Sequence, residues 1–210
     1  MTTLSALKSQ IVDDLARTDL TTPIADAITA AINFYKPKFF YFNQSRAATF
    51  STVADQSSYG VGDDADIPLF VKIDEVFITD SGSNVFPLKH YQHERMEVLL
   101  DTNAATGRSF AYSYYEKKFY LYSIPDAVYT IRPTGLIERA APATDGEADN
   151  VWMTEAFELL RCRAKAYLYL HTIHNSSRAM DMQVAERQAL TALREGNART
   201  RRGQIEPTQF

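Results

Sequence analysis

Apolar residues recur at every third or fourth position near the start of the chain, the spacing of one face of an α-helix. Two such stripes occur, Leu4, Leu7, Ile11 and Leu15 and then Ile24, Ile28, Ala31 and Ile32. The polar residues 17–19 separate them. Thr22 can act as an N-cap with Pro23 at the first helical position, and Pro37 cannot continue a helix. Residues 3–36 are therefore predicted to form a hairpin of two helices.

The middle of the chain has a different pattern. From Phe39 to Glu138 the apolar period shortens to about two, and polar breaks recur about every ten residues, which predicts antiparallel strands joined by turns. We expect strands at 39–42, 47–53, 69–79, 85–88, 110–115, 119–123 and 127–137, with a turn at 43–46 and a loop at 57–66. Residues 89–100 are predicted to form a short helix, because their apolar side chains cluster on one side.

Helical spacing returns after a small-residue, acidic linker. A helix capped by Asp149 or Asn150 is expected to run to about His174, with its apolar stripe at Trp152, Ala156, Leu159, Leu160, Tyr167 and Leu170. A last helix carries Met182, Ala185, Ala189 and Leu193 on one face, and from Gly196 onwards the sequence predicts an unstructured end.

These elements predict an α+β fold in which a helical bundle is interrupted by an inserted β region. We expect the bundle to comprise residues 1–38 and 150–198, the antiparallel β insertion residues 39–138, the linker residues 139–149, and the extended C-terminal tail residues 199–210. A chain of 210 residues with 45% apolar residues can bury a core of this kind.

Composition narrows the function. The net charge of −4 argues against a protein that binds nucleic acid with its whole surface. Positive charge is concentrated at one end, because six arginines stand against three acidic residues between positions 178 and 202. A single cysteine, Cys162, excludes an internal disulfide and a multi-thiolate zinc site. We find neither a signal peptide nor an apolar run long enough to cross a membrane, so we expect synthesis in a cytoplasm and no membrane partner.

Candidate chemistry is sparse. The pairs His90 with His93 and His171 with His174 have a spacing that can hold a metal, but supporting ligands are missing nearby. The acidic runs at 63–66 and 145–149 lack the glycine and glutamate positions of a calcium loop. Phosphate loops, nucleophile elbows and metalloprotease motifs are also missing. Cys162 lies between two arginines in sequence, yet a buried structural cysteine is favoured. We therefore predict no catalytic residues, metal or cofactor.

The sharpest feature of composition is an aromatic hairpin over residues 110–115 and 119–122. Aromatic rings on a sheet can stack on bases or sugars, which leaves open a glycan-binding or glycan-cleaving tail protein, or a small nucleic-acid-binding regulator that uses the C-terminal arginines. The hairpin carries only two lysines. Packing within the sheet or between subunits is therefore favoured.

The order of elements resembles the head-to-tail adaptor proteins of tailed bacteriophages over residues 1 to about 195. The likeness rests on the stretch from Leu121 to Tyr129 (LYSIPDAVY), with an aromatic strand and a Pro-Asp turn, and on residues around it, namely Phe34, Phe39, Phe42, Ala47, Phe50, Thr52, Trp152, Leu159 and Leu160. The resemblance implies a structural virion protein of the phage neck rather than an enzyme.

What the resemblance implies about assembly is specific. Such adaptors form a ring, usually of twelve copies, beneath the portal protein, and they offer a platform for a tail or nozzle protein. Double-stranded DNA would pass through the channel without specific binding, because an acidic protein repels the duplex. The basic end of the chain suggests portal contact through Arg199, Arg201, Arg202, Ile205 and Phe210. Assembly is expected in the bacterial host cytoplasm.

Overall fold

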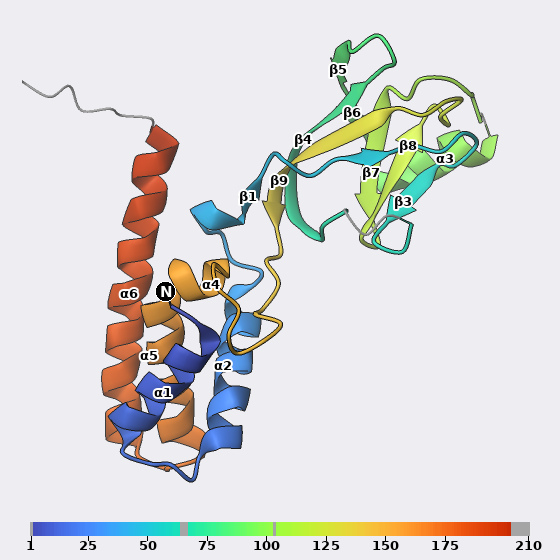
Figure 1. The fold of residues 1–210 in the computed structure, drawn as a ribbon. Helices are drawn as coiled ribbons and strands as arrows, with labels where there is room; N and C mark the ends of the chain where they lie inside the picture. The colour runs from blue at the N-terminus through green and yellow to red at the C-terminus, as the bar shows by residue number, and fades with distance from the viewer. Residues whose placement is uncertain (1, 64–66, 103, 203–210) are drawn as a thin grey trace, which may run out of the picture. The chain divides into compact units, whose positions relative to one another are not determined.

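The computed structural model describes the backbone of residues 2–63, 67–102 and 104–202, and side chains as far as residue 195. The chain divides into two compact units, Met1–Phe42 with Arg139–Phe210, and Asn43–Glu138. Helices make up the first unit, and two sheets with one helix make up the second (Figure 1). The predicted α+β class, a helical bundle with an inserted β region, is confirmed.

The helical unit begins with two antiparallel helices, as predicted. Its helices are α1 (Leu4–Leu15), α2 (Thr21–Tyr35), α4 (Val151–Thr154), α5 (Phe157–His171) and α6 (Ser176–Arg202). A 3₁₀ turn, η1 (Tyr41–Asn43), lies at the boundary between the two units. Thr3 caps α1, because its hydroxyl accepts from the backbone N–H of Ala6 at 3.2 Å. The predicted start of α2, with Pro23 at the first helical position, is two residues too late. The helix begins at Thr21, and Pro23 lies third, where its missing N–H costs nothing because first-turn N–H groups have no helical acceptor.

The predicted helix from residue 150 to 174 is in fact two helices. Asn150 is its N-cap as expected, since Asn150 Oδ1 accepts from the backbone N–H of Trp152 at 3.1 Å. The helical path then breaks at Glu155 and Ala156 before α5 begins. The apolar period continues across the break, with Trp152 and Ala156 both buried, so periodicity alone does not reveal it.

Helix α6 is longer than predicted. It continues without interruption through residues 196–202, which were expected to lie outside the last helix. A glycine inside a helix costs only about 1 kcal/mol, and extending an existing helix needs no new nucleation, so Gly196 does not end it. Residues 203–210 of the predicted tail lie outside the described residues.

The helical core is mainly aliphatic and surrounds α5. Leu7 and Ile11 of α1, with Ile24 and Ile28 of α2, are almost fully buried. Trp152 seals the end of this core, because its ring packs edge-on to Phe40 and Phe42 and its indole N–H donates to the carbonyl of Arg139 at 3.2 Å. Two predicted members of the α5 stripe, Tyr167 and Leu170, are instead 42% and 45% exposed.

The second unit contains two sheets. Its elements are β1 (Gln44–Ser45), β2 (Phe50–Ser51), β3 (Ser58–Gly60), β4 (Phe70–Thr79), β5 (Val85–Pro87), β6 (Lys89–His90), α3 (His93–Thr102), β7 (Ala111–Tyr115), β8 (Lys118–Tyr122) and β9 (Thr130–Ile137). One sheet has the order β1-β9-β4-β5, with β2 also paired to β9, and the other has the order β3-β8-β7-β6.

Several short elements differ from the prediction. The expected strand at 39–42 is not a strand and ends in η1, whereas the expected turn at 43–46 contains β1 and the expected loop at 57–66 contains β3. Among the strands of the described residues the pairing is antiparallel except between β6 and β7, which run parallel, and an isolated parallel bridge joins Thr106 to Ile124. Two- and three-residue strands depend on partners distant in sequence, so local periodicity does not predict them.

Aromatic rings form the core of the second unit. Phe119 is fully buried, and its ring centroid lies 4.9 Å from Tyr114, 5.5 Å from Phe50 and 5.6 Å from Phe70. Tyr59 is also buried, and its hydroxyl donates to the backbone carbonyl of Gln56 at 2.7 Å. The rings therefore join both sheets into one core.

Candidate interaction surfaces

The histidine pairs that were considered and set aside as metal sites lie beside tyrosine rings. His90 lies on β6 and His93 begins α3, where its ring stacks on Tyr115 with centroids 3.8 Å apart. His171 ends α5 beside Tyr167. Among the described residues, no group of three or more histidine, cysteine, aspartate or glutamate side chains could hold a metal ion.

The acidic runs shape their own loops. Asp63 accepts from the backbone N–H of Gly60 at 2.9 Å, and residues 64–66 lie outside the described residues. Asp145 forms a salt bridge with Lys8 at 2.7 Å, and Glu147 accepts hydrogen bonds from the backbone of Ala143 and the side chain of Asn150. These contacts hold the loop before α4 against the start of α1.

Cys162 is buried and poorly suited to be a nucleophile. Burial, with Glu158 beside the thiol, raises the pKa of Cys162 to about 11. The two neighbouring arginines are occupied elsewhere, since Arg161 pairs with Asp14 at 2.7 Å and Arg163 with Glu186 at 3.2 Å. A thiol with a raised pKa carries little thiolate near neutral pH, so its reactivity is low.

The aromatic hairpin β7–β8 contributes mostly to the core. Tyr112, Phe119 and Tyr122 are buried, whereas Phe110 and Tyr115 at its ends are about half exposed. The inward rings cannot stack on a base or sugar. Beside the hairpin, a groove with a volume of about 350 Å³ is lined by Phe70, Val71, Lys72, Ile73, Asp74, His90, Tyr112 and Tyr114.

A polar network is buried inside the helical unit. Glu186 on α6 is only 7% exposed, and its carboxylate accepts a hydrogen bond from the Tyr35 hydroxyl of α2 and pairs with Arg163 of α5. Burial and the carboxylate raise the pKa of Tyr35 far above its ordinary value, so the phenol keeps its proton and remains a donor. This network ties α2, α5 and α6 together.

Next to this network lies an exposed basic and aromatic cluster. The Phe34 ring, 42% exposed, is held between two cations: Lys38 Nζ lies 3.6 Å from the ring centroid, and the Arg163 guanidinium carbon 3.7 Å. Burial lowers the pKa of Lys38, and so do Arg163 and Arg194, although Glu186 acts in the opposite direction. No local sequence pattern relates these residues, because they come from α2, the turn after it, α5 and α6.

The outer side of α6 offers a shallower surface. Met180 and Val184 are 65% and 53% exposed. Further along the helix, a depression of about 410 Å³ is lined by Val184, Arg187, Gln188, Thr191, Ala192 and Glu195. The predicted portal-contact residues Arg199, Arg201 and Arg202 lie on the last turns of this helix, and Ile205 and Phe210 lie outside the described residues.

The family model described as SU10 adaptor protein matches residues 2–208. The chain belongs to this family of phage adaptors. The resemblance stated from the sequence is thereby confirmed, and the adaptor is a structural component of a phage virion that contacts head and tail components.

No protein with a curated description matches the adaptor sequence. Within the described part of the adaptor, no helix is both long enough and apolar enough to cross a membrane.

Proposed function

We propose that the adaptor forms a ring, of twelve copies as in similar adaptors, that docks beneath the portal and joins the DNA-filled head to the tail. The match to the adaptor family over residues 2–208 carries this proposal. In this position the ring surrounds part of the DNA channel and presents a platform to a tail or nozzle protein. The adaptor is made and assembled in the cytoplasm of the bacterial host.

The end of α6 is the proposed portal contact. Helix α6 has 27 residues against 15 in α5, and it extends past the end of α5 in Figure 1. This length carries Arg199, Arg201 and Arg202 beyond the packed helices. Three arginines within four positions of the sequence favour an acidic or polar groove on the partner, and Ile205 and Phe210 supply apolar anchors.

Portal binding tests this contact. A variant with Arg199, Arg201 and Arg202 changed to Glu is expected to bind a purified portal ring at least about tenfold more weakly, because reversing three charges removes attraction and adds repulsion. Arg178→Glu, at the opposite end of α6, is the matched control and should bind normally. Deleting residues 203–210 tests Ile205 and Phe210 separately. Unchanged binding of both variants would refute this role for the C-terminal end.

The adaptor acts by adhesion, without catalysis, and DNA passes through it without specific binding. The net charge of −4 supports the free passage of DNA, because an acidic surface repels phosphates. A gel-shift titration of the purified adaptor with duplex DNA at low salt should show no complex, since binding driven by phosphate contacts is strongest there. A stable complex under these conditions would contradict free passage and favour the nucleic-acid-binding alternative.

A further inference from the structure

Strand β4 has strand partners on both sides over only part of its length. Strand β9 pairs with β4 from its first residue to its last, whereas β5 pairs with it only at Phe77–Thr79, beside its C-terminal end in Figure 1. After β5 the Leu88 N–H donates to the Val76 carbonyl at 2.8 Å, and the chain then crosses to the other sheet as β6. Among the described residues, positions 70–75 of β4 therefore have a strand on one side only.

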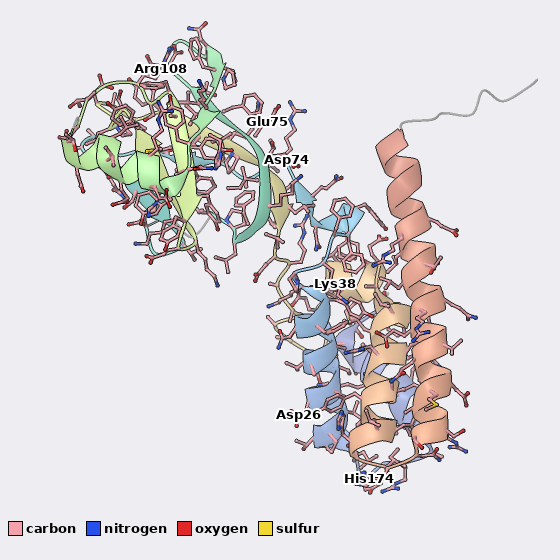
Figure 2. The ribbon with its side chains drawn as sticks, turned by 180° about the vertical axis from the view of Figure 1, so that it is seen from behind. Asp26, Lys38, Asp74, Glu75, Arg108 and His174 are labelled. Atoms are coloured by element: carbon pink, nitrogen blue, oxygen red, sulfur yellow. The ribbon has the colours of Figure 1, made fainter. Side chains whose placement is uncertain are left out.

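The groove of about 350 Å³ follows this unpaired edge. It is lined by five consecutive positions of β4, 70–74, together with His90 of β6 and Tyr112 and Tyr114 of β7. Successive side chains of a strand point to opposite faces, so a groove that touches five positions in a row reaches the edge of the strand itself. Asp74, one of the five, is labelled on β4 in Figure 2. The unpaired edge of β4 thus forms one wall of the groove, and β6 and β7 form the other.

The side chain of Tyr112 is almost buried, yet its hydroxyl has no hydrogen-bond partner among the described residues. Only 4% of Tyr112 is exposed, and it lines the groove. The neighbouring Tyr114 hydroxyl is occupied, because it accepts from the Phe70 N–H at 3.2 Å. Burial, with Asp74 and Glu75 acting in the same direction, raises the pKa of Tyr112, so its phenol keeps the proton and remains a donor. A buried donor without an acceptor costs free energy, and a bound carbonyl oxygen would supply the acceptor.

The charges of the groove are balanced. Lys72 and Asp74 form a salt bridge with each other at 2.7 Å, which leaves His90 as the other side chain of the lining that can carry charge near neutral pH. Next to the lining residues in sequence, Glu75 and Lys89 have opposite charges. A balanced groove favours a segment of low net charge over a nucleic acid, whose binding needs an excess of cations.

We infer that this groove binds an extended segment of a head or tail component, which adds to the sheet as a strand beside residues 70–75 of β4. An unpaired strand edge presents backbone N–H and C=O groups in a row, and an extended chain satisfies them together. The added strand takes the position next to β4 that β5 leaves empty, over about 20 Å. A protein segment fits better than a sugar, because the buried ring of Tyr112 offers no open face for stacking. Head and tail components are the proteins that this adaptor contacts, and strand addition depends on neither the ring nor its copy number.

The same stretch of β4 limits which segments can bind. The pairing of β4 with β9 shifts register between Phe70 and Lys72 and again between Ile73 and Glu75, and such irregularities bend a strand. A bound segment must follow this bend. The charged pair of Lys72 and Asp74 lies on the same stretch, and charged side chains at an edge oppose unselective pairing with other strands. The groove is therefore expected to accept few sequences.

Short overlapping peptides from the portal and tail proteins of the same phage are the probes. Fluorescence anisotropy measures the binding of each labelled peptide to the full-length adaptor. At least one peptide is expected to bind and to slow the hydrogen exchange of the backbone amides of residues 71–75, because new ladder hydrogen bonds protect them. The amides of β3, an edge strand of the other sheet, are the internal control and should exchange as in the free adaptor.

N-methylation of the bound peptide tests strand addition without changing the adaptor. Successive N–H groups of a strand point to opposite sides, so only every second one can donate to β4. Methylation of one alternate set of amides should weaken binding at least about tenfold, because several hydrogen bonds are lost together. Methylation of the other set should leave the affinity nearly unchanged. Equal effects of the two sets would overturn strand addition.

Tyr112→Phe tests the unpartnered hydroxyl. The ring stays and one donor is lost, so the same peptide should bind about fivefold more weakly. Tyr120→Phe, at a partly buried tyrosine of β8 outside the groove, is the matched control and should bind the peptide like the wild type. Circular dichroism confirms that both variants remain folded. Unchanged binding by Tyr112→Phe would overturn the placement of the peptide in the groove.

Other results would also refute strand addition at this edge. One is that no peptide of the portal or tail proteins binds, and another is that a bound peptide protects amides elsewhere in the adaptor. A trimer of N-acetylglucosamine that binds the wild type and loses affinity for Tyr112→Phe would identify a sugar site instead. Loss of ring formation or of portal docking bears on the proposed function alone, so the two failures are distinguishable.

Discussion

The two units of the adaptor build their cores mainly from different kinds of apolar residue. The β unit turns aromatic rings inward, with Phe119 fully buried among Phe50, Phe70 and Tyr114. The helical unit packs mostly aliphatic side chains and leaves Phe34 and Tyr167 about 42% exposed. Exposed rings occur in the β unit as well, since Phe110 and Tyr115 are about half exposed. Abundance of aromatic residues does not by itself locate an interface.

The largest effect on stability is expected in the aromatic core of the β unit. Phe119→Ala should destabilise the β unit by about 3–5 kcal/mol, because a large buried ring leaves a cavity. Hydrogen exchange should then accelerate in β7, β8 and β9 while the amides of α5 keep their protection. Leu168→Ala, in a fully buried position of α5, is the matched change in the other unit. Equal acceleration in both units from either variant would mean that they unfold as one.

The next largest effect on stability is expected where the backbones of β4 and β9 approach each other closely. Gly135 has a φ of +157°, and a Cβ there would lie 2.2 Å from the Lys72 carbonyl oxygen and 2.9 Å from the Ile73 Cα. Gly135→Ala should cost about 3 kcal/mol, since both obstacles are backbone atoms that cannot rotate away. Urea unfolding measures the loss. Gly62→Ala, with open space around its Cβ position, serves as the control and should change little.

A smaller effect on stability is expected from the buried polar network of the helical unit. Tyr35→Phe removes the hydroxyl that donates to Glu186 and should destabilise the helical unit by about 2 kcal/mol, the range for hydrogen bonds to a charged group. Thermal unfolding followed by circular dichroism checks this value. Tyr41→Phe removes a similar phenol donor to Glu155 at an exposed site and should cost much less. Equal losses would show that burial adds nothing to the network.

The smallest effect depends on pH. Burial alone would raise the pKa of Asp14, but hydrogen bonds from Lys165 and Arg161 outweigh it, and the pKa is lowered. A lowered folded-state pKa adds stability above the unfolded value of about 3.9, and that stability is lost as the pH falls through the folded pKa. Asp14→Asn should therefore cost at most about 1 kcal/mol at pH 6 and almost nothing in strong acid. Urea titrations at both pH values measure the difference, and a cost that does not change with pH would contradict the ion pair.

Longer elements of the adaptor could be predicted from sequence, and short ones could not. The stripe of α1 and the strand β4 each extend over enough residues for their period to show. The strands β1 and β3 have two and three residues, and β9 and β8 pair with them from more than fifty positions away. A pattern that short carries no period, so its structure is decided by the partner strand.

The candidate surfaces also include features that the sequence shows and features that only the packing of helices creates. The basic composition of the C-terminal end was visible in the sequence, and so was the separation of the chain into helical and β regions. More than a hundred residues separate Lys38 from Arg163, and about thirty separate Arg163 from Arg194. No local spacing in the sequence therefore relates these three cations. Packing of α2, α5 and α6 brings their charges together around the buried Glu186.

The sequence by itself determined the fold class and the presence of most of the long elements, because hydrophobic spacing specifies local geometry, although it missed the end of α6 and the break before α5. It also supported the adaptor family, because the order of elements and turns extends along almost the whole chain. Tertiary structure alone decided which apolar residues of α5, such as Tyr167 and Leu170, are exposed. Helical periodicity locates apolar positions along one helix, but only the packing of neighbouring helices determines which of them remain exposed for a partner.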